Sequence, residues 1–148
     1  LSKDANFPKN RQRQFGRVAE SLRGHNGEFV GKCGEFTEGA GNVSPNPKRV
    51  VILINGGCAS SCEQFIYYAR QSKRVTLMGE NTAGILDYGD LNILNAPCGQ
   101  FALSYPTTRS CAVEAGQGID GTGIPPSVRI GPEEKDWVQF ALRYLNGK

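Results

Sequence analysis

The chain has 148 residues, of which 39% are hydrophobic and 21% are charged, and its formal net charge is +3. This composition is ordinary for a globular domain that is long enough to bury one core. The charge is too small and too scattered to indicate nucleic-acid binding. No apolar run approaches the length of a membrane span, and no signal peptide is visible.

The first third of the chain predicts little regular structure. Phe15, Val18 and Leu22 are spaced as on one helix face, and the helix is expected to stop at Gly24. Residues 27–48 are rich in glycine, proline, asparagine and acidic residues, so we expect irregular structure with a short strand near Phe29. We treat residues 1–48 as a poorly assigned N-terminal segment and residues 49–148 as the main domain.

The main domain begins with a strand and a helix. Residues 50–54 form an unbroken apolar run that is too short for a full helix, which is typical of a strand buried on both faces. A helix is expected over 60–72, because apolar residues recur at i, i+3, i+4 and i+7; these are Cys62, Phe65, Ile66 and Ala69. A second strand is expected at 75–78, followed by a loop through Gly84.

The rest of the chain predicts a hairpin and a final helix. Strands near 90–94 and 101–105 are joined at Cys98 and Gly99. A glycine-rich segment at 116–123 leads to a short strand at 128–130, and Pro132 is expected to start a helix with Trp137 on its apolar face. Strand-helix-strand alternation predicts an α/β fold with a parallel sheet.

Ser60 stands where the first strand turns into the helix. The connecting residues, Asn55-Gly56-Gly57-Cys58-Ala59, are small and rich in glycine. At a helix N-terminus, free backbone N–H groups and the positive end of the helix dipole can stabilise an oxyanion, so Ser60 is a candidate nucleophile. The alternative is that Ser60-x-x-Glu63 is only a capping box. A nucleophile must face an open cleft, whereas a buried Ser60 would argue against catalysis.

Three segments together resemble the tail-specific, or C-terminal-processing, serine peptidases, and most of all their tricorn-core-like branch. The first runs from Val51 through Ser-Ser-Cys-Glu-Gln to Phe65. The second is Val75-Thr-Leu-Met-Gly-Glu-Asn-Thr-Ala-Gly84, and the third is Asp120-Gly-Thr-Gly-Ile-Pro-Pro126. They occur in the order of the family and cover the chain from about Arg49 to its C-terminus.

The resemblance implies a fold and a set of site residues. The fold would be part of a ClpP/crotonase-like spiral, a mixed sheet with flanking helices. Ser60 would be the nucleophile, with oxyanion-hole N–H groups from Ser61 and Gly57, and Thr82 and Gly84 would contact the substrate. Asp120 would orient a catalytic base, although Asp-Gly is also a common turn pair. From its place after a strand, Arg109 could meet a substrate carboxylate; a solvated loop arginine is the alternative.

The base expected for such a site is missing from this chain. The processing branch uses a lysine just after the Thr-x-Gly turn, where this chain has Ile85. The tricorn-like branch uses a histidine far upstream, but the single histidine, His25, lies in a polar turn typical of a surface loop. We therefore expect the base to come from outside the chain.

A second absence is consistent with this expectation. The family has an upstream Asp-x-Arg-x-Asn-x-Gly-Gly strand that has no counterpart here, and the chain opens on Leu1. We expect a C-terminal fragment or processed product, whose partners would be a polypeptide substrate and the missing N-terminal part of the same domain. Homo-oligomerisation is also open.

Five cysteines in so short a chain suggest an oxidising, extracytoplasmic compartment, secreted or periplasmic. Cys98 and Cys111 could staple the hairpin, and Cys58 and Cys62 could pair around Ser60, which would leave Cys33 over. Buried free thiols are the alternative, and the ligand set for zinc is weak.

The sequence therefore predicts a serine endopeptidase domain that hydrolyses peptide bonds through an acyl-enzyme at Ser60, with no cofactor and no metal. Two alternatives stay open. One is a catalytically inactive binding or assembly module on the same fold. The other is a crotonase-like acyl-transfer enzyme, although no clear basic site for the phosphates of coenzyme A is present.

Overall fold

The structure is a computed structural model that describes residues 8–31, 33 and 44–147. It divides into two compact units, Leu1–Thr37 and Glu38–Lys148. In the first unit, helix α1 (Lys9–Ser21) forms where a helix was predicted, but it buries no residue. Phe29 lies outside any strand, so the short strand predicted there is wrong. This stretch has no partner strand among the described residues of its unit.

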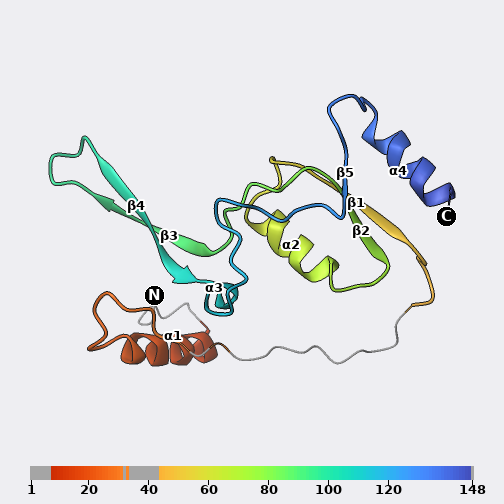
Figure 1. Cartoon of the computed structure of the whole chain (residues 1–148). Helices are drawn as coiled ribbons and strands as arrows, with labels where there is room; N and C mark the ends of the chain where they lie inside the picture. Colours follow the sequence, from red (N-terminus) through yellow and green to blue (C-terminus); the bar gives the residue numbers. More distant parts are fainter. Residues whose placement is uncertain (1–7, 32, 34–43, 148) are drawn as a thin grey trace. The chain divides into compact units, whose positions relative to one another are not determined.

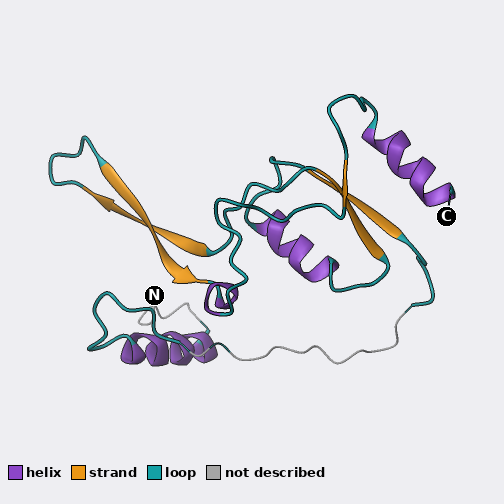
Figure 2. Ribbon diagram, viewed as in Figure 1, coloured by secondary structure: helices purple, strands orange, loops and turns teal. Residues whose placement is uncertain are grey.

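The second unit contains a parallel sheet of three strands, β1 (Val50–Ile54), β2 (Val75–Gly79) and β5 (Val128–Arg129), in the order β1-β2-β5 (Figure 2). Strands β1 and β2 pair over their whole length, from Val50 opposite Val75 to Ile54 opposite Gly79. Helix α2 (Ser61–Ala69) makes the crossover between them. The predicted α/β class, with a sheet and flanking helices, is confirmed.

A helix covers each face of this sheet (Figure 1). Neighbouring residues of a strand point to opposite faces, so Leu77 and Met78 of β2 belong to different clusters. Leu77 packs with Ile66 of α2. Met78 packs with Ala141 of helix α4 (Trp137–Asn146). The core therefore consists of two thin layers, one on each side of the sheet.

Two burial predictions are wrong. Strand β1 is not buried on both faces, because it is an edge strand and Leu53 is 37% exposed. The apolar face predicted for α2 is also displaced. Phe65 is 58% exposed, and the side chains that α2 buries are Glu63 and Ile66. A carboxylate can replace an apolar residue in this stripe because Glu63 is fully hydrogen-bonded.

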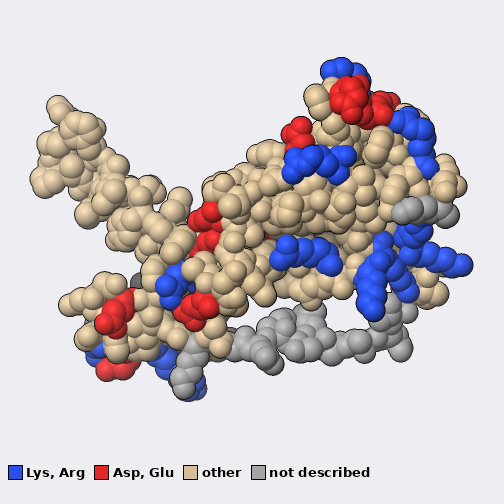
Figure 3. All heavy atoms as spheres, viewed as in Figure 1, with Lys and Arg blue, Asp and Glu red and all other residues tan. Residues whose placement is uncertain are grey.

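Strands β3 (Tyr88–Asn95) and β4 (Ala102–Arg109) form the predicted antiparallel hairpin, from Tyr88 opposite Arg109 to Asn95 opposite Ala102. Between Leu91 and Thr108 it contains no charged residue, and this arm is drawn in uniform tan in Figure 3.

Two helix predictions need correction. A short helix, α3 (Cys111–Glu114), was not predicted; it is capped by Ser110, whose side chain accepts from Ala112 N–H. Helix α4 starts at Trp137 and not at Pro132. Asp136 Oδ1 accepts from Gln139 N–H at 2.9 Å, so this residue is the N-cap that sets the start.

Cys58 and Cys62 form a disulfide that spans the turn containing Ser60. Cys98 is a free, exposed thiol, whereas Cys111 and Cys33 are both disulfide-bonded. The predicted disulfide between Cys98 and Cys111 is therefore wrong, and Cys33 is not the unpaired cysteine. Among the described residues, no helix is both long and apolar enough to cross a membrane.

Candidate active site

The chain makes a strained turn at Ser60. Strand β1 ends at Ile54, a short glycine-rich link follows, and Ser60 is the residue from which α2 starts. Its backbone angles are φ 53° and ψ −114°, in a region that residues with a side chain rarely adopt. Such strain persists only where the surroundings impose it, and it is concentrated at functional sites.

Ser60 is also the N-cap of α2. Ser60 and Glu63 form a capping box, in which Glu63 Oε2 accepts from Ser60 N–H at 3.1 Å. Ser60 is nevertheless an exposed residue.

The two predicted oxyanion-hole amides differ in their availability. Ser61 N–H, at the first turn of α2, donates to no acceptor in the described part of the chain. Gly57 N–H donates to Asn55 Oδ1 at 2.9 Å. Ser61 therefore offers a ready donor beside the Ser60 hydroxyl, whereas Gly57 would have to release the Asn55 side chain first.

Glu63 holds the turn in place from inside the protein. Its side chain is fully buried, and it accepts four hydrogen bonds. Besides the bond from Ser60 N–H, Oε1 accepts from the Thr82 hydroxyl and from Gly84 N–H, each at 2.6 Å, and Oε2 accepts from Ile85 N–H at 3.0 Å. One carboxylate thus connects the turn at Ser60 to the loop at 82–85.

The electrostatic state of Glu63 follows from these contacts. Burial raises the pKa of this carboxyl, but the bond from Thr82 and the three backbone N–H groups lower it more, so its pKa lies below the ordinary value of 4.5. Glu63 is therefore an anion at neutral pH. Its role is to hold backbone groups in place.

The three sequence segments of the family resemblance meet at this carboxylate. The Thr82 hydroxyl donates to Glu63 and accepts from Ile124 N–H at 2.7 Å, which brings in the third segment. Thr82 and Gly84 are buried, and both direct their hydrogen-bonding groups to Glu63. Neither lines the cleft described below, and their contact with substrate stays a prediction.

Glycines allow the second and third segments to pack backbone against backbone. Gly84 and Gly123 both have positive φ, 72° and 69°. A Cβ on Gly123 would collide with the carbonyl oxygen of Thr82, and one on Gly84 would lie 2.6 Å from Gly123 N. The chain can approach itself this closely only because both positions lack a side chain.

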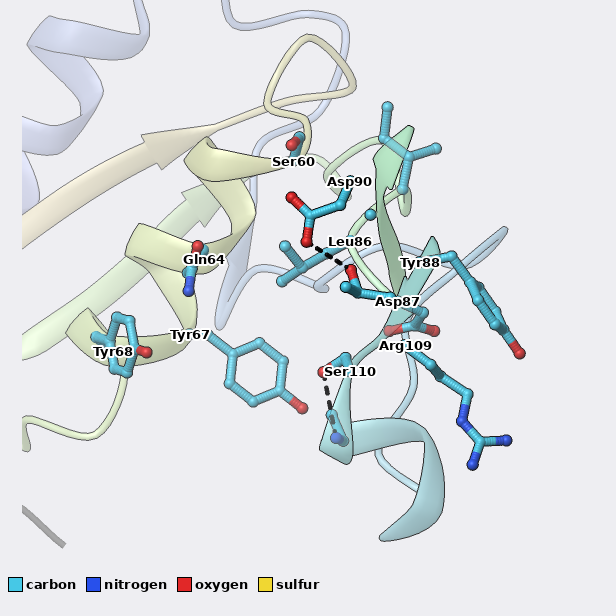
Figure 4. Close-up of a pocket in the computed structure, with 14 residues that line it drawn as sticks. Ser60, Gln64, Tyr67, Tyr68, Leu86, Asp87, Tyr88, Asp90, Arg109 and Ser110 are labelled. Carbon is cyan, nitrogen blue, oxygen red and sulfur yellow. Dashed lines mark hydrogen bonds between the residues drawn. The ribbon is translucent and has the colours of Figure 1, made fainter. Parts of the chain in front are cut away.

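Ser60 opens onto a cleft of about 470 Å³ (Figure 4). One wall is α2, which contributes Gln64, Tyr67 and Tyr68 beyond Ser60. The other walls are residues 85–90, the end of β4 at 108–110, and Ala112 in α3. This volume suits a ligand of the size of one or two amino-acid residues. Ser60 thus lies at the mouth of a real cavity.

Asp120 does not line this cleft. Its Oδ1 accepts from Asp87 N–H at 2.8 Å, and Asp87 Oδ2 in turn accepts from Ile119 N–H at 2.7 Å and from Asp120 N–H at 2.8 Å. The two aspartates therefore hold the two loops together. The predicted role of Asp120 in orienting a base stays a prediction.

The residues that line the cleft include no histidine and no lysine. His25, in the first unit, is exposed, and its Nδ1 lies 3.0 Å from Glu28 Oε2.

Arg109 does line the cleft, and its Nη2 donates to Glu114 Oε1 at 2.6 Å. Within the described ranges, no group of three or more potential ligands could hold a metal ion.

Sequence reasoning missed Asp90. It lines the cleft, it has a positive φ of 50°, and its Oδ2 accepts from the Thr108 hydroxyl at 2.9 Å. The available signal was the run Asp87-Tyr88-Gly89-Asp90 directly after the second family segment, where two acids flank a glycine at the start of a strand. The sequence pattern predicts Asp90 only as the first residue of a hairpin strand.

Ser60 therefore stands, with a strained backbone, between a sheet strand and a helix N-terminus. The model of Peptidase family S41 matches residues 7–130, and the chain therefore belongs to this family. This confirms the resemblance to the tail-specific, or C-terminal-processing, peptidases. The match begins within the N-terminal segment, for which sequence motifs provided no assignment.

Three solved structures are similar to the chain over part of its length. They are the photosystem II D1 C-terminal processing protease (25% identity, TM-score 0.45), a protein from Parabacteroides merdae ATCC 43184 described as a peptidase (18%, 0.46), and mature CPAF complexed with lactacystin (23%, 0.44). The similarity covers 68%, 66% and 58% of this chain. It spans only 25%, 31% and 17% of those chains.

Proposed function

We propose that this chain carries the nucleophile part of a serine endopeptidase, in which the Ser60 hydroxyl attacks a peptide carbonyl and forms an acyl-enzyme. The carbonyl oxygen becomes an oxyanion next to Ser61 N–H, the amine of the cleaved bond leaves, and water then hydrolyses the ester. The substrate is a polypeptide, bound in extended form along the cleft.

The observation that carries this proposal is the conformation of Ser60. A serine needed only as a cap has no reason to adopt a φ of 53°, because an N-cap is satisfied in the β region. The strained conformation brings the hydroxyl to the cleft, while Glu63 and the Cys58–Cys62 bridge hold the backbone on either side.

The general base comes from outside this chain in our proposal, because the cleft is lined by neither histidine nor lysine. A polypeptide segment outside this chain would supply it, and Asp120 would orient it. A disulfide next to the nucleophile further supports an extracytoplasmic location, since such bonds persist in oxidising compartments.

Labelling with a fluorophosphonate tests the proposal, because this reagent modifies only an activated serine. The intact natural protein should gain one label on Ser60, identified by peptide mass spectrometry, and the Ser60→Ala variant should gain none. Ser127→Ala is the matched control, since this exposed serine makes no side-chain hydrogen bond in the described structure and lies away from the cleft. Absence of any label on Ser60 in the intact protein would refute the proposal.

A second function is favoured by the lack of a base at the cleft. The chain could act as an inactive peptidase-like module that binds extended polypeptide without cleaving it. Ser60→Ala would then leave peptide affinity unchanged and no fluorophosphonate would be incorporated, whereas an active peptidase loses its label with the same substitution.

A further inference from the structure

Of the two carboxylates that line the cleft, Asp87 and Asp90, only Asp90 is exposed. Asp90 lines the cleft, and no ion pair to it exists among the residues that the structure describes. Its Oδ2 accepts from the Thr108 hydroxyl at 2.9 Å, and Oδ1 accepts from no donor in the described part of the chain. A carboxylate with one oxygen anchored and the other open is suited to accept a hydrogen bond from a ligand.

The backbone holds Asp90 in an unusual conformation. Its φ is 50°, a left-handed value that aspartate adopts more readily than most residues with a side chain. Two neighbouring threonines of β4 maintain it: the Thr107 hydroxyl donates to Asp90 O at 2.6 Å, and the Thr108 hydroxyl holds the carboxylate. These two hydrogen bonds fix the direction of the Asp90 side chain.

The other charged groups of the cleft do not neutralise Asp90. Asp87 is buried, and its Oδ2 accepts two backbone N–H groups. Arg109 is bound to Glu114, and Figure 4 shows its guanidinium directed away from Ser60 and Asp90. In the same view the Asp90 carboxylate lies on the Ser60 side of the cleft. Asp90 therefore places a negative charge on the Ser60 side of the cleft.

An aromatic ring forms another part of the cleft wall. Tyr67 projects from α2 into the space in front of Ser110 (Figure 4), and its hydroxyl donates to Gln117 O at 2.8 Å, which fixes the ring. The Arg70 guanidinium already lies over this ring, 4.0 Å from its centre. A cation is attracted to such a ring and to a carboxylate, whereas an acidic side chain is repelled by Asp90.

From these contacts we propose that Asp90 forms a subsite for a cationic side chain, lysine or arginine, of the polypeptide that binds across Ser60. The ammonium or guanidinium group donates to Asp90 Oδ1 while Thr108 retains Oδ2, and the aliphatic stem lies along the tyrosine-lined wall. This subsite rests on the proposed function for its substrate class. It also predicts a preference for substrates with a lysine or arginine at one position, which the peptidase chemistry alone does not specify.

The test is a positional scan with dye-labelled, end-capped hexa-alanine peptides in which one residue is lysine, norleucine or glutamate. Fluorescence anisotropy with the intact protein carrying Ser60→Ala measures affinity without any reaction at position 60. We expect lysine at one position to bind about tenfold more tightly than norleucine, as for a hydrogen bond to a charged group. Asp90→Asn should remove this preference and leave norleucine peptides unaffected. Asparagine also tolerates a left-handed φ, so the fold is retained.

Glu133→Gln is the matched control, because it removes the same charge from an exposed residue outside the cleft. It should leave the lysine preference intact. Fluorophosphonate labelling of each variant with Ser60 retained separates the two proposals. If Ser60 is labelled but lysine peptides bind no better than norleucine peptides, the subsite proposal alone is overturned. The same holds if Ser60 is labelled and the lysine preference persists in Asp90→Asn. A lysine preference that depends on Asp90, but without labelling, overturns the peptidase proposal alone.

Discussion

Glu63 shows how one side chain can organise a site without taking part in its chemistry. Its carboxylate is completely buried, yet each oxygen accepts two hydrogen bonds, and the donors come from both sides of the turn at Ser60. A buried charge is tolerated only when it is satisfied in this way. The strained conformation of Ser60 therefore depends on Glu63.

The substitution Glu63→Gln tests this dependence. Glutamine keeps the shape, but its NH₂ group would face N–H donors, so at least one backbone amide loses its acceptor. We expect a loss of about 3 kcal/mol in the free energy of unfolding, measured by urea denaturation at pH 7. Gln64→Glu, on the exposed side of α2, is the control for a change at the same helix end. An unchanged urea midpoint for Glu63→Gln would contradict the structural role given to Glu63.

Cysteine chemistry provides a second prediction at the residue scale. Of the five cysteines, only Cys98 is a free thiol, and it is exposed at the hairpin turn. Iodoacetamide should therefore add one group to the native, unreduced protein and five after reduction in denaturant, as counted by intact mass. Peptide mapping should find the single native label on Cys98. A second native label would show that one of the described disulfides is absent.

At the scale of elements, the site is built where two loops pack without side chains between them. The 82–84 loop and the 119–123 loop touch through backbone atoms, because an added Cβ at Gly123 would strike Thr82. The Thr82 hydroxyl then connects this contact to α2 through Glu63 and to Ile124 N–H. The glycines of the family segments thus allow the helix, the sheet edge and the third segment to meet.

Gly123→Ala should disrupt this contact more than Gly121→Ala does. Both residues have positive φ, 69° and 76°, so both substitutions cost about 1–2 kcal/mol of backbone strain. An added Cβ at Gly121 meets open space, whereas the one at Gly123 forces Thr82 to move. We expect Gly123→Ala to be the more destabilising by at least about 1 kcal/mol in urea unfolding. Equal losses would mean that the close approach is not required.

At the scale of the whole molecule, the described core consists of two small clusters on opposite faces of a three-stranded sheet. Large apolar side chains are exposed on the hairpin, for example Phe101 at 72% and Leu91 at 69%. The chain spans a quarter of the length of the D1 processing protease that it resembles. Because these apolar clusters are small, one buried polar network contributes a large fraction of the free energy of unfolding.

Stability should therefore respond to acid through Glu63. Its pKa is lower in the folded protein than the ordinary 4.5, so its contribution is complete above that value and is lost as the pH falls through the folded pKa. Between the two pKa values the slope for this group is at most about 1.4 kcal/mol per pH unit. Urea midpoints from pH 7 to pH 3 should fall less steeply in Glu63→Gln than in the unsubstituted protein. Parallel curves would exclude Glu63 as the titrating group.

Local patterns were sufficient for most elements of the second unit. The apolar run at 50–54, the capping residues at 60 and 63, and the turn at Cys98 and Gly99 each predicted the element that the structure contains. Burial was harder to predict, because Phe65 and Leu53 depend on which neighbours cover them. The start of α4 was misplaced because Pro132 competed with Asp136 as a start signal, and only the cap bond to Gln139 N–H decides between them.

By itself, the sequence determined the order of strands and helices, the position of Ser60 at a turn and the three segments that identify the family, because these depend on neighbours along the chain. The tertiary structure decided that the three segments converge on Glu63, that Thr82 and Gly84 are occupied inside the protein, and that Asp90 lies in the same cleft as Ser60. These contacts join residues about 20 to 60 positions apart in the chain. No local pattern encodes them, because they arise only when the sheet and its loops pack together.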